Sequence, residues 1–469
     1  MENAKRLPTL RIPAKASLWY IGSSAIARLI GALSTPIFTR LLTPEEYGLY
    51  PLYNTWLGIF TVVITLEITG AAIYRGLQRH SDDSDGFIRA ALGLVLLFFG
   101  VFCLLYAVFA RGVNALTGLD SGVTMLMLTE ILGATVLSLY TAKARFKYRY
   151  RAVAFINILT ATLTPLVSVS IIYLTDIRAQ ARIIASSVTA FALALPIFFT
   201  VVKGAGRVFN PEIWGYLLKR SLPLLPHYLA MTMILKVGEL GVSRLYGAAA
   251  LGKYSVALSL GMALTVVTGG VLSALAPWML RRMKECDLFR VRELLFILTE
   301  LVSLCCLGLL AVVPEALSLF SSSQYHAILP AVYPIALSVI PTFLSSALMS
   351  GGVYFEKGWL SALPSIVSAT VSAILTATVL PLVDYRFVSL FALVSYTVLA
   401  ALNVAVFTML SKTPPIHVTK TLVVFLVTCA YAALLFTFRE IILSRFLLTL
   451  PLLPILLKVA KEALQRIKE

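Results

Sequence analysis

The sequence has few charged residues. Asp, Glu, Lys and Arg make up 13% of its 469 residues, whereas soluble globular proteins carry about 25%. Hydrophobic residues account for 59% of the chain. This composition excludes a soluble globular protein and indicates an integral membrane protein.

The sequence also lacks the motifs of common catalytic and redox sites. Its five cysteines show neither CxxC nor Cys/His spacing, so they predict no disulfide framework and no metal site, and we interpret them as small packing residues. The four histidines are scattered and have no nucleophile beside them. The phosphate-binding loop motif GxxxxGKS/T does not occur, which excludes an ATPase within this chain. We therefore expect no enzymatic activity, no cofactor and no metal.

One acidic cluster needs a separate interpretation. Asp82, Asp83 and Asp85 resemble the acids with which glycosyltransferases hold a divalent metal and a nucleotide sugar. They fall in a short polar loop, however, and no nucleotide-binding αβ domain surrounds them. We predict a solvated loop here.

Long apolar runs follow one another along almost the whole chain. Each transmembrane helix takes about 20 residues, so the length accommodates about fourteen helices with short loops. The first run follows a basic segment, as in a cleavable signal peptide, but it resumes beyond Arg28, so we predict a retained span. Arg439, Glu440 and Arg445 interrupt the last two runs, which leaves open one span plus an interfacial helix. The runs lie at residues 16–38, 47–72, 90–110, 122–142, 152–174, 183–202, 222–243, 254–280, 294–313, 328–352, 359–380, 387–410, 421–437 and 443–457.

The Lys and Arg residues are distributed asymmetrically. The net charge of +17 would indicate nucleic-acid binding in a soluble chain. With both termini in the cytoplasm, however, 28 of the 39 Lys and Arg residues fall on the inner side, nine in outer loops and two inside spans. This alternation follows the positive-inside rule. We therefore expect a multi-pass protein of the inner or plasma membrane with both termini cytoplasmic and no nucleic-acid partner.

Two segments are similar at an offset of 204 residues. Residues 39–50 align without a gap on residues 243–254, with Arg, Leu, Gly and Tyr at identical positions. The offset equals six spans, so it predicts two six-helix lobes in a parallel repeat plus two C-terminal helices. Such repeats are typical of secondary transporters. A helical bundle whose turns agree by chance is the alternative.

The predicted fold is thus an all-α integral membrane protein with about 14 transmembrane helices. In the linker between the lobes, Asn210 and Pro211 are typical of a helix start. The apolar face that follows is predicted to anchor this helix at the inner membrane interface, and consists of Ile213, Trp214, Leu217 and Leu218. The predicted parts are an N-lobe at 1–202, a cytoplasmic linker at 203–220, a C-lobe at 221–410 and a C-terminal helix pair with a basic tail at 411–469.

Two cations fall inside predicted spans, where a charge is expensive and is expected to face protein or water. Arg28 lies in the first span with Thr35 on its helical face. Lys236 lies in the seventh span with Thr232 and Glu239 on its face. The 204-residue offset maps the first of these faces onto the second. We predict that both faces line a central cavity that binds an anionic group such as a diphosphate.

Structural roles for these charges stay open. Glu239 is close enough along the helix to neutralise Lys236, and Glu67 on the neighbouring helix can neutralise Arg28. Glu67 and Glu130 lie inside predicted spans and are candidates for ion coupling, although structural pairing accounts for them equally well.

Three segments carry a recognisable pattern: PIFTRLLTPEEYGLY at 36–50, ARFKYRYR at 144–151 and SLPLLPH at 221–227. Together they resemble the polysaccharide-transporter family of Wzx-type oligosaccharide flippases, in the superfamily that also holds multidrug extrusion (MATE) proteins and the peptidoglycan lipid II flippase. The resemblance implies a V-shaped, two-lobe transporter in which Arg28 and Lys236 match the cations of a central cavity. Its implied cargo is a polyprenyl-diphosphate-linked oligosaccharide, moved from the inner to the outer leaflet by alternating access. Membrane lipid, polysaccharide polymerases and glycosyltransferases of surface polysaccharide synthesis are the implied partners.

Three other functions stay open. A MATE-like multidrug or cation-coupled extruder needs an intramembrane acid in its first lobe, where the first span has Arg28 instead. A membrane polysaccharide polymerase or glycosyltransferase commonly needs a large outer loop, and the longest predicted outer loop covers only 314–327. A passive scaffold for glycan assembly is the third alternative.

Overall fold

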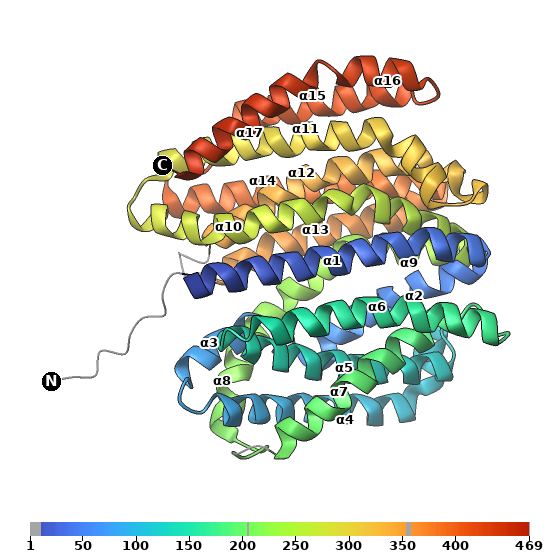
Figure 1. Cartoon of the computed structure of the whole chain (residues 1–469), viewed down its shortest axis with the longest axis vertical. Helices are drawn as coiled ribbons and strands as arrows, with labels where there is room; N and C mark the ends of the chain where they lie inside the picture. The colour runs from blue at the N-terminus through green and yellow to red at the C-terminus, as the bar shows by residue number, and fades with distance from the viewer. Residues whose placement is uncertain (1–10, 204–205, 353–357, 469) are drawn as a thin grey trace. The chain divides into compact units, whose positions relative to one another are not determined.

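The computed structural model describes residues 11–203, 206–352 and 358–468, and every regular element in these ranges is a helix (Figure 1). Lys5, Arg6 and Lys357, three cations of the predicted inner side, lie outside the described residues. The helices are α1 (Arg11–Leu41), α2 (Pro44–Thr65), α3 (Ala71–Arg79), α4 (Ser84–Thr117), α5 (Ser121–Phe146), α6 (Tyr150–Leu174), α7 (Ala181–Lys203), α8 (Pro211–Ser221), α9 (Leu225–Gly261), α10 (Thr265–Lys284), α11 (Leu288–Phe320), α12 (Leu329–Gly352), α13 (Gly358–Thr378), α14 (Val388–Ser411), α15 (Val418–Thr437), α16 (Ile442–Thr449) and α17 (Leu452–Lys468), with short 3-10 turns between several of them.

These helices confirm the predicted all-α membrane fold. Eleven segments of the described chain are long and apolar enough to cross a membrane. One of them, residues 211–284, contains α8, α9 and α10. Within it α9 bends at Gly247, whose φ of 82° is a conformation that glycine adopts without steric cost. The bend separates two helical segments, residues 225–246 and 248–261, and it lies between the predicted spans 222–243 and 254–280.

The second predicted span, 47–72, is too long. α2 ends at Thr65, and Leu66 and Glu67 follow in the left-handed region with φ of 49° and 50°. Two successive residues in that region end an α-helix, because their Cβ atoms crowd the following carbonyl groups. Glu67 therefore lies in the turn that leads to α3 and not in a helix that extends over residues 47–72.

The last predicted span is interrupted. α16 ends at Thr449 and α17 starts at Leu452, with Pro451 between them. Proline has no N–H to continue the helical hydrogen bonds, so a break at this position is expected. The C-terminal region thus contains α15 and a broken pair, α16 and α17.

The chain divides into two compact units. Unit 1 comprises residues up to Ser34 and Leu52–Leu229, and unit 2 comprises Thr35–Pro51 and the residues from Ala230 onward. This division differs from the predicted parts, since residues 221–229 of the predicted C-lobe lie in unit 1 and the predicted C-terminal helix pair lies in unit 2. The linker helix α8 belongs to unit 1, whereas the end of α1 and the start of α2 belong to unit 2.

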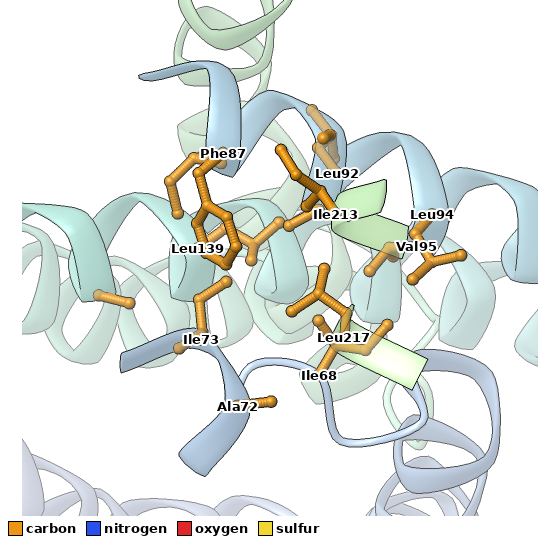
Figure 2. Packing of buried hydrophobic residues seen from close by; sticks show 14 of the residues in the cluster. Ile68, Ala72, Ile73, Phe87, Leu92, Leu94, Val95, Leu139, Ile213 and Leu217 are labelled. Carbon is orange, nitrogen blue, oxygen red and sulfur yellow. The ribbon is translucent and has the colours of Figure 1, made fainter. Parts of the chain in front are cut away.

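α8 is part of the hydrophobic core of unit 1. It begins as predicted, since the Asn210 side chain accepts a hydrogen bond from the Ile213 N–H at 3.2 Å. Ile213 and Leu217 are buried among side chains of α3, α4 and α5, as Figure 2 shows. Trp214 donates its indole N–H to the carbonyl oxygen of Ala90 at 2.8 Å. The apolar face thus packs on protein, so its predicted role as an anchor in lipid is wrong.

The acidic cluster before α4 has structural roles. Asp83 caps α4 by accepting a hydrogen bond from the Gly86 N–H at 2.9 Å. Asp85 pairs with Lys143 and lies 3.8 Å from the Nζ atom of Lys147. No cluster of three or more potential metal ligands occurs among the described residues.

A capping box shapes the turn between α1 and α2. The Thr43 N–H donates to the Glu46 carboxylate at 2.8 Å, and the Glu46 N–H donates to the Thr43 hydroxyl at 3.3 Å. Pro44 occupies the first helical position, where its missing N–H costs nothing. The sequence TPEE therefore starts α2 by satisfying the free N–H groups of its first turn.

This turn forms hydrogen bonds and an aromatic contact with other residues of unit 2. The Thr39 hydroxyl donates to the carbonyl oxygen of Phe320 at 3.1 Å, and Arg40 donates to that of Leu319 at 2.9 Å. Tyr47 meets Tyr325 edge to face, with ring centroids 6.0 Å apart. The end of α1 and the start of α2 are thus held at the C-terminal end of α11.

Within unit 2, α2 and the second segment of α9 make a reciprocal close contact. A Cβ atom on Gly48 would collide with the carbonyl oxygen of Ala248, and one on Gly252 would collide with that of Pro44. The 204-residue offset maps Gly48 onto Gly252 and Pro44 onto Ala248, so it exchanges the two contacts. A two-fold relation between repeats produces this reciprocity, which supports the predicted repeat.

We expect Gly48→Ala and Gly252→Ala to lower the thermal stability of the detergent-purified protein. Each added methyl meets backbone, which cannot move aside as a side chain can, and overpacking of this kind costs about 1–3 kcal/mol. Gly112→Ala is the matched control, because nothing lies within 4 Å of a Cβ at Gly112 in α4. Equal melting temperatures for all three variants would contradict the close contact.

Candidate functional site

In unit 2, the first segment of α9 carries a buried ion pair. The Lys236 ammonium donates to both carboxylate oxygens of Glu239 at 3.0 Å. Glu239 is 4% exposed, whereas a quarter of the Lys236 side chain is accessible. Tyr254 and Tyr396, both buried, lie within range of the Glu239 charge. The arrangement satisfies the carboxylate and leaves the ammonium at the accessible side of the pair.

The surrounding packing holds this segment of α9 in place. Ile234, Tyr396 and Leu399 form a small apolar cluster between α9 and α14. The Ser372 hydroxyl of α13 donates to the carbonyl oxygen of Ile234 at 2.7 Å. Lys236 and Glu239 therefore project from a helix that is fixed on both sides.

The predicted hydroxyl partners lie in the same unit. Thr232 is half-buried, one helical turn before Lys236, so Thr232, Lys236 and Glu239 share one face of α9. Thr35 is also half-buried and belongs to unit 2 through the end of α1. Both threonines interact with their surroundings.

Arg28 differs from Lys236 in its surroundings. It lies near the middle of α1 in unit 1, its side chain is exposed, and it forms no hydrogen bond or ion pair within the described chain. Its predicted structural partner, Glu67, does not pair with it. The guanidinium thus uses none of its donors on the described residues.

Glu130 is the centre of a hydroxyl cluster in unit 1. Its Oε2 atom accepts hydrogen bonds from the Tyr53 hydroxyl at 2.7 Å, the Ser186 hydroxyl at 2.7 Å and the Ser187 hydroxyl at 3.3 Å. Tyr53 and Ser187 are fully buried and also lie 3.2 Å apart. No cation of the described chain pairs with Glu130. Sequence analysis did not identify the three hydroxyls, because they come from α2 and α7 and nothing local in the sequence links them to α5.

Arg445, one of the charges that interrupt the last two apolar runs, is a further buried charge. It lies on α16, is 2% exposed, and donates through both terminal nitrogens to the Glu315 carboxylate of α11. A third bond goes to the carbonyl oxygen of Ala311. Bidentate pairing of this kind ties α16 to α11.

Similar folds occur among solved transporter structures. The lipid II flippase MurJ, in an inward closed conformation, matches with a TM-score of 0.67 and 12% identity over 95% of this chain and 99% of that chain. An inward-facing MATE family multidrug resistance transporter of the MOP superfamily matches with a TM-score of 0.63 and 15% identity over 83% of this chain and 98% of that chain. A MOP superfamily transporter from Pyrococcus furiosus, for which a reverse polarity of the binding pocket is described, matches with a TM-score of 0.58 and 15% identity over 85% of this chain and 96% of that chain. At such identities the likeness shows the fold alone.

Sequence comparison identifies the family more directly. No curated protein sequence matches the chain. The family model described as "Polysaccharide biosynthesis protein" matches residues 14–283, which is more than half of the chain and includes all of α2 to α9. This match confirms the resemblance carried by the three sequence motifs, and the chain belongs to the polysaccharide biosynthesis protein family.

Proposed function

We propose that this protein is a flippase that moves a polyprenyl-diphosphate-linked oligosaccharide from the cytoplasmic to the outer leaflet by alternating access. The family and the transporter fold support a multi-pass membrane transporter of lipid-linked precursors. The diphosphate and the oligosaccharide are our proposal. The observation that carries it is Arg28, an exposed cation without a partner in the described structure near the middle of α1.

A lipid-facing position would be costly for this side chain. An arginine at the centre of a membrane helix costs about 2.5–3.5 kcal/mol even on insertion scales. A water-filled path that admits an anion removes this cost. The planar guanidinium also matches phosphate oxygens with two parallel N–H donors. We therefore propose that Arg28 binds the diphosphate of the cargo.

The face of α9 suits the sugar part of the cargo. Lys236 and Glu239 neutralise each other, so this face offers hydrogen-bonding groups without net charge. Thr232 and Thr35 add hydroxyl groups in the same unit. Sugar hydroxyls both donate and accept hydrogen bonds, which such a mixed set satisfies.

The alternatives fit the same residues less well. A cationic drug would be repelled by Arg28, and Glu130, the half-buried acid of unit 1, accepts hydrogen bonds from three hydroxyls. A polymerase or glycosyltransferase needs catalytic carboxylates in an outer loop, yet Glu315 of the predicted segment 314–327 is bound to Arg445. We therefore propose a transporter without enzymatic activity, placed in the inner or plasma membrane with both termini cytoplasmic. Polymerases and glycosyltransferases are its proposed partners.

We place ion coupling at Glu130 in preference to Glu67. Glu130 is a half-buried carboxylate with three hydroxyl donors and no paired cation in the described chain, so inside a membrane a proton or a small cation would balance its charge. Glu67 lies in the turn after α2, where its main-chain N–H donates to the Thr65 hydroxyl at 3.3 Å. The driving force of transport is therefore assigned to unit 1.

Arg28→Ala should reduce surface glycan at least tenfold in cells that depend on this protein, because the diphosphate loses its ligand. Arg28→Lys should retain partial function, since an ammonium keeps the charge but lacks the two parallel N–H donors of the guanidinium. Arg111→Ala, which removes an exposed cation of α4, is the control. Normal glycan in Arg28→Ala, at equal protein level in the membrane, would refute the assignment.

Neutralising the α9 pair distinguishes binding from structural support. Lys236→Gln leaves Glu239 buried without its cation and should cost about 3–5 kcal/mol of stability, and Lys236→Glu should be worse. The double variant Lys236→Gln, Glu239→Gln should recover the melting temperature. We expect its transport to stay low, because the cargo contacts are altered. Full recovery of transport together with stability would reduce the pair to structural support.

Glu130→Gln should uncouple transport from ion gradients. In proteoliposomes, transport by the unmodified protein is expected to rise with an imposed proton or sodium gradient, and Glu130→Gln should remove that response because an amide binds neither ion as a carboxylate does. Glu67→Gln is the comparison variant and should keep the response. An unchanged response in Glu130→Gln would contradict this role.

A further inference from the structure

A second basic site lies away from Arg28, on the short helices of unit 1. A pocket of about 350 Å³ is lined by Arg79 of α3 and by Tyr216, Lys219 and Arg220 of α8. All three cations are exposed. We call this the α3–α8 pocket.

The core of unit 1 fixes the two helices that form this pocket. Leu77 of α3 and Leu217 of α8 are fully buried in the same apolar cluster, part of which Figure 2 shows. The cations occupy the last turns of their helices, where positive charge complements the helix dipole. The pocket is therefore built on packed elements.

An aromatic side chain organises the pocket. The guanidinium carbon of Arg79 lies 5.5 Å from the centre of the Tyr216 ring, and that of Arg220 lies 6.0 Å from it. His80 meets the same ring edge to face at 6.4 Å and stacks on Phe87 at 5.3 Å. Two guanidinium groups from different helices are thus brought to one ring that is supported from within the unit.

The cations of the pocket are not neutralised by nearby acids. No carboxylate of the described chain forms an ion pair with Arg79, Lys219 or Arg220. The arrangement contrasts with Arg282, which lies over Trp278 and also pairs with Glu285. Like charges held around one ring repel each other unless an anion lies between them.

We propose that the α3–α8 pocket binds the phosphate headgroup of an anionic membrane lipid. The pocket falls on the predicted inner side, on short helices that lead into the long apolar α4 and α9. Basic clusters on such amphipathic helices attract anionic headgroups. Tyr216 adds a phenolic O–H donor beside the three cations. This site goes beyond the proposed transport, because it uses neither Arg28 nor the face of α9.

The test is lipid binding to the full-length purified protein, measured by native mass spectrometry with phosphatidylglycerol, with a polyprenyl diphosphate and with neutral phosphatidylethanolamine. The triple variant Arg79→Gln, Lys219→Gln, Arg220→Gln should bind the anionic lipids roughly a hundredfold more weakly. Each removed charge accounts for about a fivefold loss of affinity. Stronger retention of phosphatidylglycerol supports a resident phospholipid as the source of the headgroup, and stronger retention of the diphosphate supports the cargo as the source.

The matched control removes the same number of charges from α17. Lys458, Lys461 and Arg466 line another surface hollow, which also contains Glu462. The triple variant Lys458→Gln, Lys461→Gln, Arg466→Gln should bind phosphatidylglycerol like the unmodified protein. Equal loss in both triple variants, or loss in neither, would overturn the proposal.

Two further variants separate the role of the ring from that of the charges, and this pocket from Arg28. Tyr216→Phe keeps the ring and should retain most of the binding, whereas Tyr216→Ala should lose it. Arg28→Ala should bind phosphatidylglycerol normally, so failure of the transport proposal and failure of this one are observed separately. Normal binding by Tyr216→Ala would contradict the role of the ring.

Discussion

A charge inside a membrane needs a partner or access to water, and this requirement governs the polar architecture of the protein. Arg445 meets it with Glu315, Lys236 meets it with Glu239, and Glu130 is surrounded by hydroxyl groups. Arg28, in contrast, has no partner side chain in the described structure. Since these three charges are satisfied within their own units, Arg28 differs from them in leaving its requirement open to a ligand, and this difference connects the architecture to a phosphate-bearing cargo.

The reciprocal contact gives the repeat a physical basis. Gly48 and Gly252 allow two backbones to approach at positions related by the repeat offset, and the capping box starts α2 at that point. The end of α1 and the start of α2 consequently belong to unit 2, although their other halves belong to unit 1. α1 and α2 change unit beside Pro36 and Pro51, where a helical hydrogen bond is missing. The motif that marks the family in sequence thus belongs to unit 2, although the chain on either side of it belongs to unit 1.

Hydropathy and charge predicted the membrane class, the helical fold and the approximate position of most helices, because these properties are local. The failures come from contacts that are not local. An amphipathic pattern in α8 does not distinguish a lipid surface from a protein surface, so Ile213 and Leu217 were assigned to the wrong one. The position of Glu67 depends on a turn in which Leu66 and Glu67 have positive φ, and no glycine at these two positions indicates that turn in the sequence. Arg445 and the hydroxyls around Glu130 find partners far away in sequence, which spacing cannot reveal.

A vesicle assay tests most directly whether this chain moves a diphosphate-linked glycolipid between leaflets. Purified protein is reconstituted into vesicles that contain a fluorescent polyprenyl-diphosphate oligosaccharide in both leaflets, and an impermeant reductant is added outside. We expect nearly all the fluorescence to be lost, because inner-leaflet lipid is carried outward, while a labelled neutral phospholipid keeps its protected half. Protection of half the glycolipid, equal to that in vesicles without protein, would contradict transport of this cargo.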